Sequence, residues 1–141
     1  MFLKLASKLI AAALAAASMD ASSAPTFYIH LKNWPSSIEK RAKEQLSPII
    51  ANGECLTPTG RPEQAEECHR FDWFKGDATR EALKKHSVSR KLTLAYSRDK
   101  NEMIVQIYRW DGAKFQRVRN SKIPLPADVN FKTTAVQWSF K

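Results

Sequence analysis

The chain has 141 residues, of which 43% are hydrophobic and 26% are charged, and its formal net charge is +9 at pH 7. The hydrophobic share is too high for a disordered tail, and the charged share is too high for a bundle of membrane-spanning helices. The length fits one domain with one modest core.

Residues 1–23 have the three-part layout of a secretory signal peptide. A cationic start that contains Lys4 and Lys8 precedes an apolar run from Leu9 to Ala17, and small and polar residues follow. The apolar run is shorter than the roughly 20 residues that a bilayer-spanning helix requires. An uncleaved amphipathic membrane anchor is the alternative, and the layout favours a signal that is cleaved.

Cleavage of this signal fits two positions, after Ala17 or after Ser23. We favour cleavage after Ser23, because Ala24-Pro25 is a suitable start for a mature chain. The mature protein is then one α+β domain over residues 24–141, with no transmembrane anchor left. The alanine-rich leader indicates bacterial export, to the periplasm or the medium.

The first strand and the first helix follow the cleavage site. Residues 26–33 are rich in β-branched and aromatic side chains and predict a strand that stops at Trp34. Ser36 and Glu39 have the spacing of a capping box at the start of a helix. Apolar residues continue at helical spacing, and we expect the helix to end at Ser47-Pro48, where a short further turn begins.

Cys55 and Cys68 are the two cysteines of the chain, and both lie in the part that we expect to be exported, where thiols oxidise. Two prolines and a glycine between them indicate a loop, so the pattern predicts a disulfide that closes this loop. A metal site on Cys55, Cys68 and His69 is the weaker alternative, because adjacent Cys and His ligands have poor tetrahedral spacing. We predict no metal and no other cofactor.

A short aromatic segment and a second helix come after the loop. The aromatic residues of segment 71–76 are expected to pack over the core. Asp77 is the expected N-cap of a helix over residues 77–86, and basic residues in its last turn suit the negative end of the helix dipole.

The rest of the chain predicts β-structure. Four segments have strand character: residues 91–97, 102–110, 115–119 and 131–140. Polar turns separate the first three, and a loop with two prolines precedes the fourth. Because helices come early and strands late, we expect an α+β fold. Its one antiparallel sheet would combine the N-terminal strand with a C-terminal four-strand meander, with both helices on one face and one disulfide-closed loop.

The sequence has no motif typical of an enzyme active site. A GxGxxG loop, a Walker A loop, a GxSxG elbow and an HExxH helix are all absent from it. His30 is more typical of a sheet position than of a catalytic base, His69 of a loop surface, and His86 of a helix end. The glutamates of the disulfide loop are expected to be solvated rather than catalytic.

A basic and aromatic patch on a predicted hairpin is the strongest candidate site. Arg109 and Trp110 end one strand, and Arg117 and Arg119 lie on the strand that returns. Arginine and tryptophan are frequent in protein–protein hot spots, and a cationic patch attracts acidic partners. The alternative is an ordinary sheet face that charge keeps soluble.

We therefore expect a small exported binding protein without catalytic activity, of inhibitor or immunity type. Its partner would be an acidic protein of the cell envelope; nucleic acid is not expected, because the known binding motifs are missing. An exported basic hydrolase such as a ribonuclease, with His30 or His69 as acid or base, is one alternative function. A structural or assembly component of an envelope machine is another.

Overall fold

The computed structural model describes residues 24–62, 67–83 and 89–141. The expected signal peptide lies outside these residues, as do three of the loop's polar residues and the expected end of the second helix. The elements, in chain order, are β1 (Thr26–Lys32), α2 (Ser36–Ala51), β2 (Arg70–Trp73), α3 (Asp77–Leu83), β3 (Ser89–Ser97), β4 (Glu102–Trp110), β5 (Phe115–Pro124) and α4 (Phe131–Ser139).

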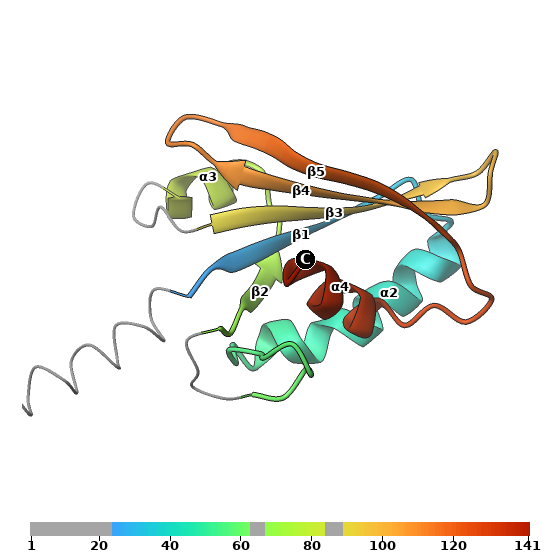
Figure 1. Cartoon of the computed structure of the whole chain (residues 1–141), viewed down its shortest axis with the longest axis horizontal. Coiled ribbons are helices and arrows are strands. Elements are labelled where there is room, and N and C mark those ends of the chain that lie inside the picture. Colours follow the sequence, from blue (N-terminus) through green and yellow to red (C-terminus); the bar gives the residue numbers. More distant parts are fainter. Residues whose placement is uncertain (1–23, 63–66, 84–88) are drawn as a thin grey trace, which may run out of the picture.

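The five strands of the described residues form one mixed sheet in the order β2-β1-β3-β4-β5 (Figure 1). β1 is parallel to both β2 and β3, whereas β3, β4 and β5 are antiparallel to one another. The α+β class is confirmed, but the expected all-antiparallel sheet is wrong. The reason lies in the connections, because the chain crosses back along the sheet before each of β2 and β3.

The aromatic segment after the disulfide loop begins as the edge strand β2. Its register with β1 places Phe71 beside Phe27, and the two rings lie 6.0 Å apart. Phe71 is buried and Trp73 packs against the core, so the expected packing of the aromatic residues is confirmed for these two. A strand was not expected here, because four residues are too few to show a period in the sequence.

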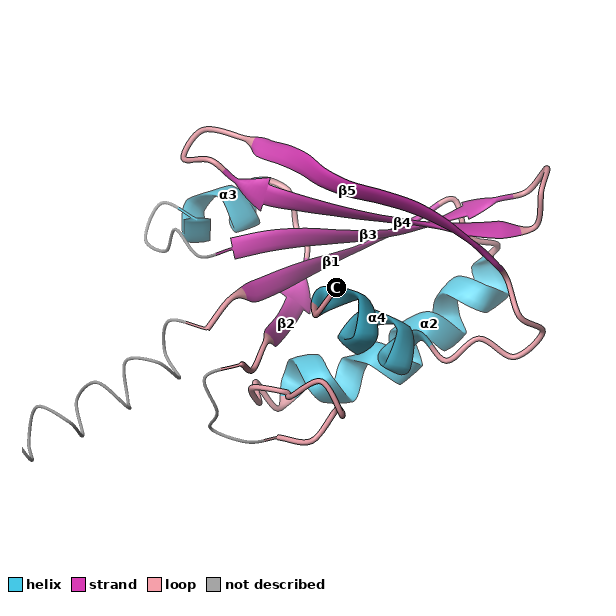
Figure 2. Ribbon diagram, viewed as in Figure 1, coloured by secondary structure: helices cyan, strands magenta, loops and turns pink. Residues whose placement is uncertain are grey.

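Two helices, α2 and α4, cover one face of the sheet (Figure 2). Alternate residues of β3 and β4 point to these helices and are buried, among them Leu92, Leu94 and Val105. Ala42 and Leu46 of α2 meet them from the other layer, as the helical spacing predicted. We call this side of the sheet the helix face.

The start of α2 differs from the expected capping box. Pro35 occupies the N-cap position and no side chain caps the helix. The Pro35 carbonyl instead accepts hydrogen bonds from the backbone N–H groups of Ile38 and Glu39, at 3.0 and 2.9 Å. The Ser36 and Glu39 side chains therefore do not form the reciprocal pair that their spacing suggested.

The end of α2 also differs, because the helix continues through Pro48 to Ala51. Proline removes one backbone donor from the interior of a helix. Ile49 is buried in the core, and its burial holds this last turn. The Ser47 hydroxyl donates to the Lys43 carbonyl at 2.6 Å, one turn earlier.

Residues 131–139 form helix α4, not the expected final strand. The Asn130 side chain caps the helix and accepts a hydrogen bond from the Thr133 backbone N–H at 3.0 Å. Phe131, Ala135 and Val136 are buried, which is helical spacing. The β-branched and aromatic composition of the segment suggested a strand, but β-propensity depends strongly on context and the cap decides otherwise.

Trp34 and Gln45 fasten α4 to the rest of the core. The Trp34 indole N–H donates to the Leu94 carbonyl at 2.8 Å, and its ring stacks on Tyr96 and meets Phe131 edge-on, with centroids 5.2 and 5.1 Å away. The Gln45 side chain accepts from the Phe131 backbone N–H at 2.6 Å. The strand-ending residue Trp34 is thus a central core residue.

The disulfide between Cys55 and Cys68 is confirmed, and both residues are buried. Next to the bridge, the backbones of Leu56 and His69 exchange two hydrogen bonds of 2.8 Å. The bridge therefore ties the chain leaving α2 to the start of β2.

Removal of the bridge in a Cys55→Ser/Cys68→Ser variant should lower the free energy of unfolding by about 3 kcal/mol, since the closed loop restricts the unfolded chain. Guanidinium titration followed by circular dichroism measures this loss. The wild-type protein in reducing buffer is the control and should lose the same amount. Equal midpoints for the variant and the oxidised wild type would contradict the prediction.

Loss of the α4 cap in Asn130→Ala should lower the free energy of unfolding by about 1 kcal/mol, because one backbone donor loses its acceptor. Asn130→Asp keeps an acceptor at the same place and is the matched control. Urea titration of both variants should show a loss for alanine and little change for aspartate. An equal loss in both would show that the cap is not the cause.

Candidate functional site

The sheet face opposite α2 and α4 is polar and aromatic, and we call it the open face. Strand register places Tyr28, Lys91, Tyr108 and Arg117 in one row across four strands. Paired residues on neighbouring strands share a face, so this row lies on the side away from the buried Leu92.

Helix α3 lies at one end of the open face, since its residues line a cavity together with residues of that face. The expected packing of both early helices on one face is therefore wrong. Helix α2 covers the helix face, whereas α3 covers one end of the open face. Asp77 is the first residue of α3 rather than a residue before it.

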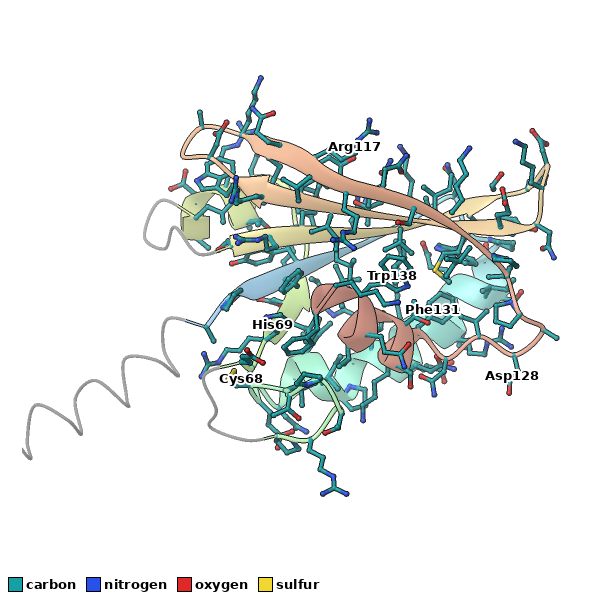
Figure 3. All side chains as sticks on the ribbon, viewed as in Figure 1. Cys68, His69, Arg117, Asp128, Phe131 and Trp138 are labelled. Atoms are coloured by element: carbon teal, nitrogen blue, oxygen red, sulfur yellow. A yellow bond between two sulfur atoms is a disulfide. The ribbon has the colours of Figure 1, made fainter. Side chains whose placement is uncertain are left out.

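A β-bulge separates the two predicted arginines of β5. The register shifts between Ile107 and Tyr108, so that Arg119 pairs with Ile107 and Arg117 pairs with Tyr108. Arg117 therefore belongs to the open face and Arg119 to the helix face, although residues two apart on a regular strand share a face. Val118 lies at the bulge and is 54% exposed. Figure 3 shows Arg117 on β5, far from His69 and Cys68.

Arg109 and Trp110 are divided in the same way. Arg109 pairs with Arg90 on one side and Gln116 on the other and is exposed on the helix face. Trp110 lies on the open face, where its ring meets Phe115 at 5.2 Å in an edge-on arrangement. The structure thus brings all four predicted residues to one hairpin but presents them on two surfaces.

The turn of this hairpin is held by Asp111. One carboxylate oxygen accepts from the backbone N–H groups of Ala113 and Lys114, both at 2.8 Å, and the other accepts from the Gln116 side chain at 2.9 Å. These bonds, first of all the one from Lys114, lower the pKa of Asp111 to about 2. The expected turn is confirmed, and its one carboxylate is occupied within the turn.

Lys91 is the central residue of the open face. Its Nζ lies 4.4 Å from the ring centroid of Tyr108, 4.8 Å from that of Phe74 and 5.3 Å from that of Phe115. Three aromatic faces therefore hold one ammonium group. In the part of the chain that the structure describes, no hydrogen-bond acceptor or carboxylate partners this group. Burial, and secondly Lys32, lowers the pKa of Lys91.

A cavity of about 270 Å³ opens beside this lysine, between α3 and the β4–β5 hairpin. Its walls combine aromatic rings with an excess of positive charge. The rings are those of Phe74, Trp110 and Phe115, the cations are Arg80, Lys91 and Lys114, and the one carboxylate is that of Asp77. The sequence pattern placed Trp110 in the candidate patch and Lys114 near it, but it did not identify the other cavity residues, because they meet only through the register of distant strands.

The two histidines considered for catalysis lie on different faces. His30 belongs to the open face, 5.3 Å from the ring of Phe74, and burial followed by Lys91 and Lys32 lowers its pKa. It lines a cavity of about 420 Å³ where β1 extends beyond its last pair with β2, Ile29 with Trp73. His69 packs at the helix face between Phe27 and Phe140. The structure does not bring the two together, and His86 lies outside the described residues.

His69 fastens the end of α4. Its ring stacks on Phe140 with centroids 3.8 Å apart, and its Nδ1 lies 3.1 Å from the Ser139 hydroxyl. That hydroxyl donates to the Val136 carbonyl at 2.8 Å, so His69 is the donor to Ser139. A serine whose proton is bound in this way is not activated by the histidine. Burial, and secondly Arg90, lowers the pKa of His69 to about 4.

No family model matches the sequence, and no significant match was found among curated proteins or solved structures. Over residues 24–62, 67–83 and 89–141, no group of His, Cys, Asp and Glu side chains is arranged to hold a metal ion. Within the same residues, no helix has the length and apolar character needed to cross a membrane.

Acidification should destabilise the protein through His69. Its pKa is 6.5 when unperturbed and about 4 in the folded protein, so the unfolded chain takes up the proton first. The stabilisation is complete above pH 6.5 and is lost as the pH falls toward 4. Because the ring is partly exposed, solvent screening leaves a loss of about 1–2 kcal/mol.

Urea titrations of the wild type and His69→Phe between pH 7 and pH 4 isolate this contribution, since His30 and other groups titrate in both proteins. We expect the wild-type curve to fall more steeply. Parallel curves would contradict the assignment to His69.

Proposed function

We propose that this chain is a small exported binding protein of inhibitor or immunity type, which docks its β4–β5 hairpin on an acidic protein of the cell envelope. One observation carries the proposal: strand β5 and the residues next to it, from Gly112 to Ala127, carry positive charges only. Between Gly112 and Ala127 the sequence has four basic residues and no acidic one. They are Lys114, Arg117, Arg119 and Lys122, and all are exposed.

Lys114 lies in the turn beside the Asp111 carboxylate, whereas the three cations of β5 have no ion-pair partner within the described residues. The ion pair found there is on α2, between Lys43 and Glu39 at 3.7 Å, and no carboxylate of the described chain pairs with the cations of β5. A run of like charges on one strand repels itself, and an acidic partner removes that repulsion on binding.

The neighbouring side chains favour a protein partner over simple solubility. Charge alone protects an edge strand from aggregation, as lysines do on many sheets. Here the cations accompany Trp110, Phe115 and the exposed Val118, so the hairpin also offers apolar area for burial. Tryptophan and arginine together are typical of the residues that dominate binding energy in protein interfaces.

The hairpin is rigid before binding, which supports docking. Asp111 fixes the turn through three hydrogen bonds, and the two strands pair on both sides of the bulge at Val118. A surface that is already ordered loses little conformational entropy when a partner binds. Inhibitors that act by steric blockage use such preformed elements.

Export is supported by two features of the chain. Residues 1–23 have the layout of a cleaved signal, and the Cys55–Cys68 bridge is compatible with an oxidising compartment. A basic protein that is exported encounters the acidic proteins of the cell envelope, so we propose a partner among them.

The proposal predicts that Arg117→Ala/Arg119→Ala reduces partner capture about tenfold, as expected for the loss of interface arginines. A photo-crosslinking amino acid in place of Val118, in protein expressed with its leader in the native host, identifies the partner by mass spectrometry. Lys40→Ala/Arg41→Ala removes the same charge from the exposed side of α2 and is the matched control. Unchanged capture by the β5 variant, or a captured protein without an acidic surface, would overturn the proposal.

A further inference from the structure

The cavity beside Lys91 has the size of a side-chain pocket. Its volume is about 270 Å³, below the roughly 300–1,000 Å³ that small-molecule and cofactor sites occupy. It lies where α3, β3 and the β4–β5 hairpin meet, so it adjoins the surface proposed to dock the partner. One or two side chains of a partner fit such a volume.

Lys91 is held ready for an anion. Three rings fix the position of its ammonium group, and the described chain offers no acceptor for its N–H donors. No polar side-chain atom among the described residues is both fully buried and unpartnered, so the Lys91 ammonium group is not fully buried. The residue lines the cavity, where an anion can reach it. A fixed, accessible cation binds an anion at a lower entropic cost than a mobile surface lysine does.

The other charges of the pocket point to an anion as well. Arg80 and Lys114 line it with Lys91, against the single carboxylate of Asp77. Arg80 comes from α3 and Lys114 from the hairpin turn, so the cations approach from different walls. The net positive charge attracts anions and disfavours cations.

The chemistry of the walls favours a carboxylate over a phosphate. Phosphate sites in proteins commonly combine bidentate arginines with a cradle of backbone N–H groups. This pocket has one guanidinium, two ammonium groups and three aromatic rings. Rings suit the methylene groups of a glutamate or an apolar neighbour in the same peptide, and ammonium groups suit its carboxylate.

We infer that this pocket is the anchor for the partner: it binds a Glu or Asp side chain of an acidic segment through Lys91, while an apolar residue of that segment packs on Trp110. The inference rests on the proposed function and assigns the short-range contact within it. The cations of β5 supply the general attraction, whereas Lys91 selects a carboxylate at one place.

A direct test titrates the mature protein with an acetylated, amidated Glu-Leu-Glu-Glu peptide and follows the Trp110 indole resonance by NMR. We expect a saturable shift at Trp110, with the buried Trp34 unaffected as the internal reference. Lys91→Met keeps the length of the chain over the rings and should weaken binding about tenfold, as expected for a lost charge-assisted hydrogen bond. Lys100→Met, in the exposed β3–β4 turn, is the matched control and should bind like the wild type.

Lys114→Gln is a second, independent variant on the exposed turn, and it should also weaken binding. It keeps the inference testable even where Lys91→Met disturbs the fold. A Gln-Leu-Gln-Gln peptide should give no shift. No saturable shift with the acidic peptide, or a shift that Lys91→Met and Lys114→Gln both leave unchanged, would overturn the inference. Tighter binding of inorganic phosphate or a thymidine oligonucleotide at the same resonance would also overturn it.

The crosslinking experiment distinguishes the two proposals. If capture depends on Arg117 and Arg119 but not on Lys91, docking through β5 stands and the anchor is wrong. If the peptide binds at Trp110 but Arg117→Ala/Arg119→Ala captures as much partner as the wild type, the carboxylate pocket is supported and docking through β5 is wrong.

Discussion

Strand β1 hydrogen-bonds on both edges to strands that run parallel to it, and this pairing determines the arrangement of the whole molecule. A parallel neighbour requires the chain to travel back along the sheet before it pairs. The first return carries α2 and the disulfide loop and leads to β2; the second carries α3 and leads to β3. One return covers the helix face and the other reaches the end of the open face. The core and the cavity beside Lys91 are therefore two results of the same strand order.

The division between the faces explains why stability and binding use different residues. On the helix face, α2 and α4 enclose apolar strand residues, and Trp34, Gln45 and His69 fasten α4 by polar contacts and stacking. On the open face, Lys91 and Tyr108 are partly exposed and Arg117 is exposed, whereas Tyr28 is buried. Arg90 and Arg109 lie opposite each other at the rim, and like charges in that position destabilise a sheet. Burial, and then Arg109, lowers the pKa of Arg90. An acidic partner at the end of the hairpin would relieve this repulsion.

Several features that depend on neighbouring residues were predictable from the sequence, although the capping box at Ser36 and the helix end at Pro48 were predicted wrongly; features that depend on distant pairing were not predictable. The hairpin turn at Asp111, the helical face with Ala42 and Leu46, and the bridge between the only two cysteines follow from local patterns and from counting. Helix α4 was predicted as a strand because its β-branched and aromatic composition favours one, and the cap at Asn130 favours the helix. The parallel pairing of β1 leaves no local signal. The bulge that separates Arg117 from Arg119 leaves none either, so the patch looked continuous in the sequence and is divided in the structure.

The cations of β5 and Lys91 of β3 would suit two stages of the proposed association. Exposed charges such as those of β5 act over about a Debye length and raise the rate at which an acidic partner arrives, and salt weakens them. A cation held among aromatic rings is less accessible to salt and would act only when a carboxylate enters the pocket, so in the proposed complex it would govern the dissociation rate. Lys91 gains this property from Tyr108, Phe74 and Phe115, which come from three separate parts of the chain. The fold therefore contributes more to the site than the basic composition does: it turns one of the chain's 23 basic residues into a fixed donor beside a pocket.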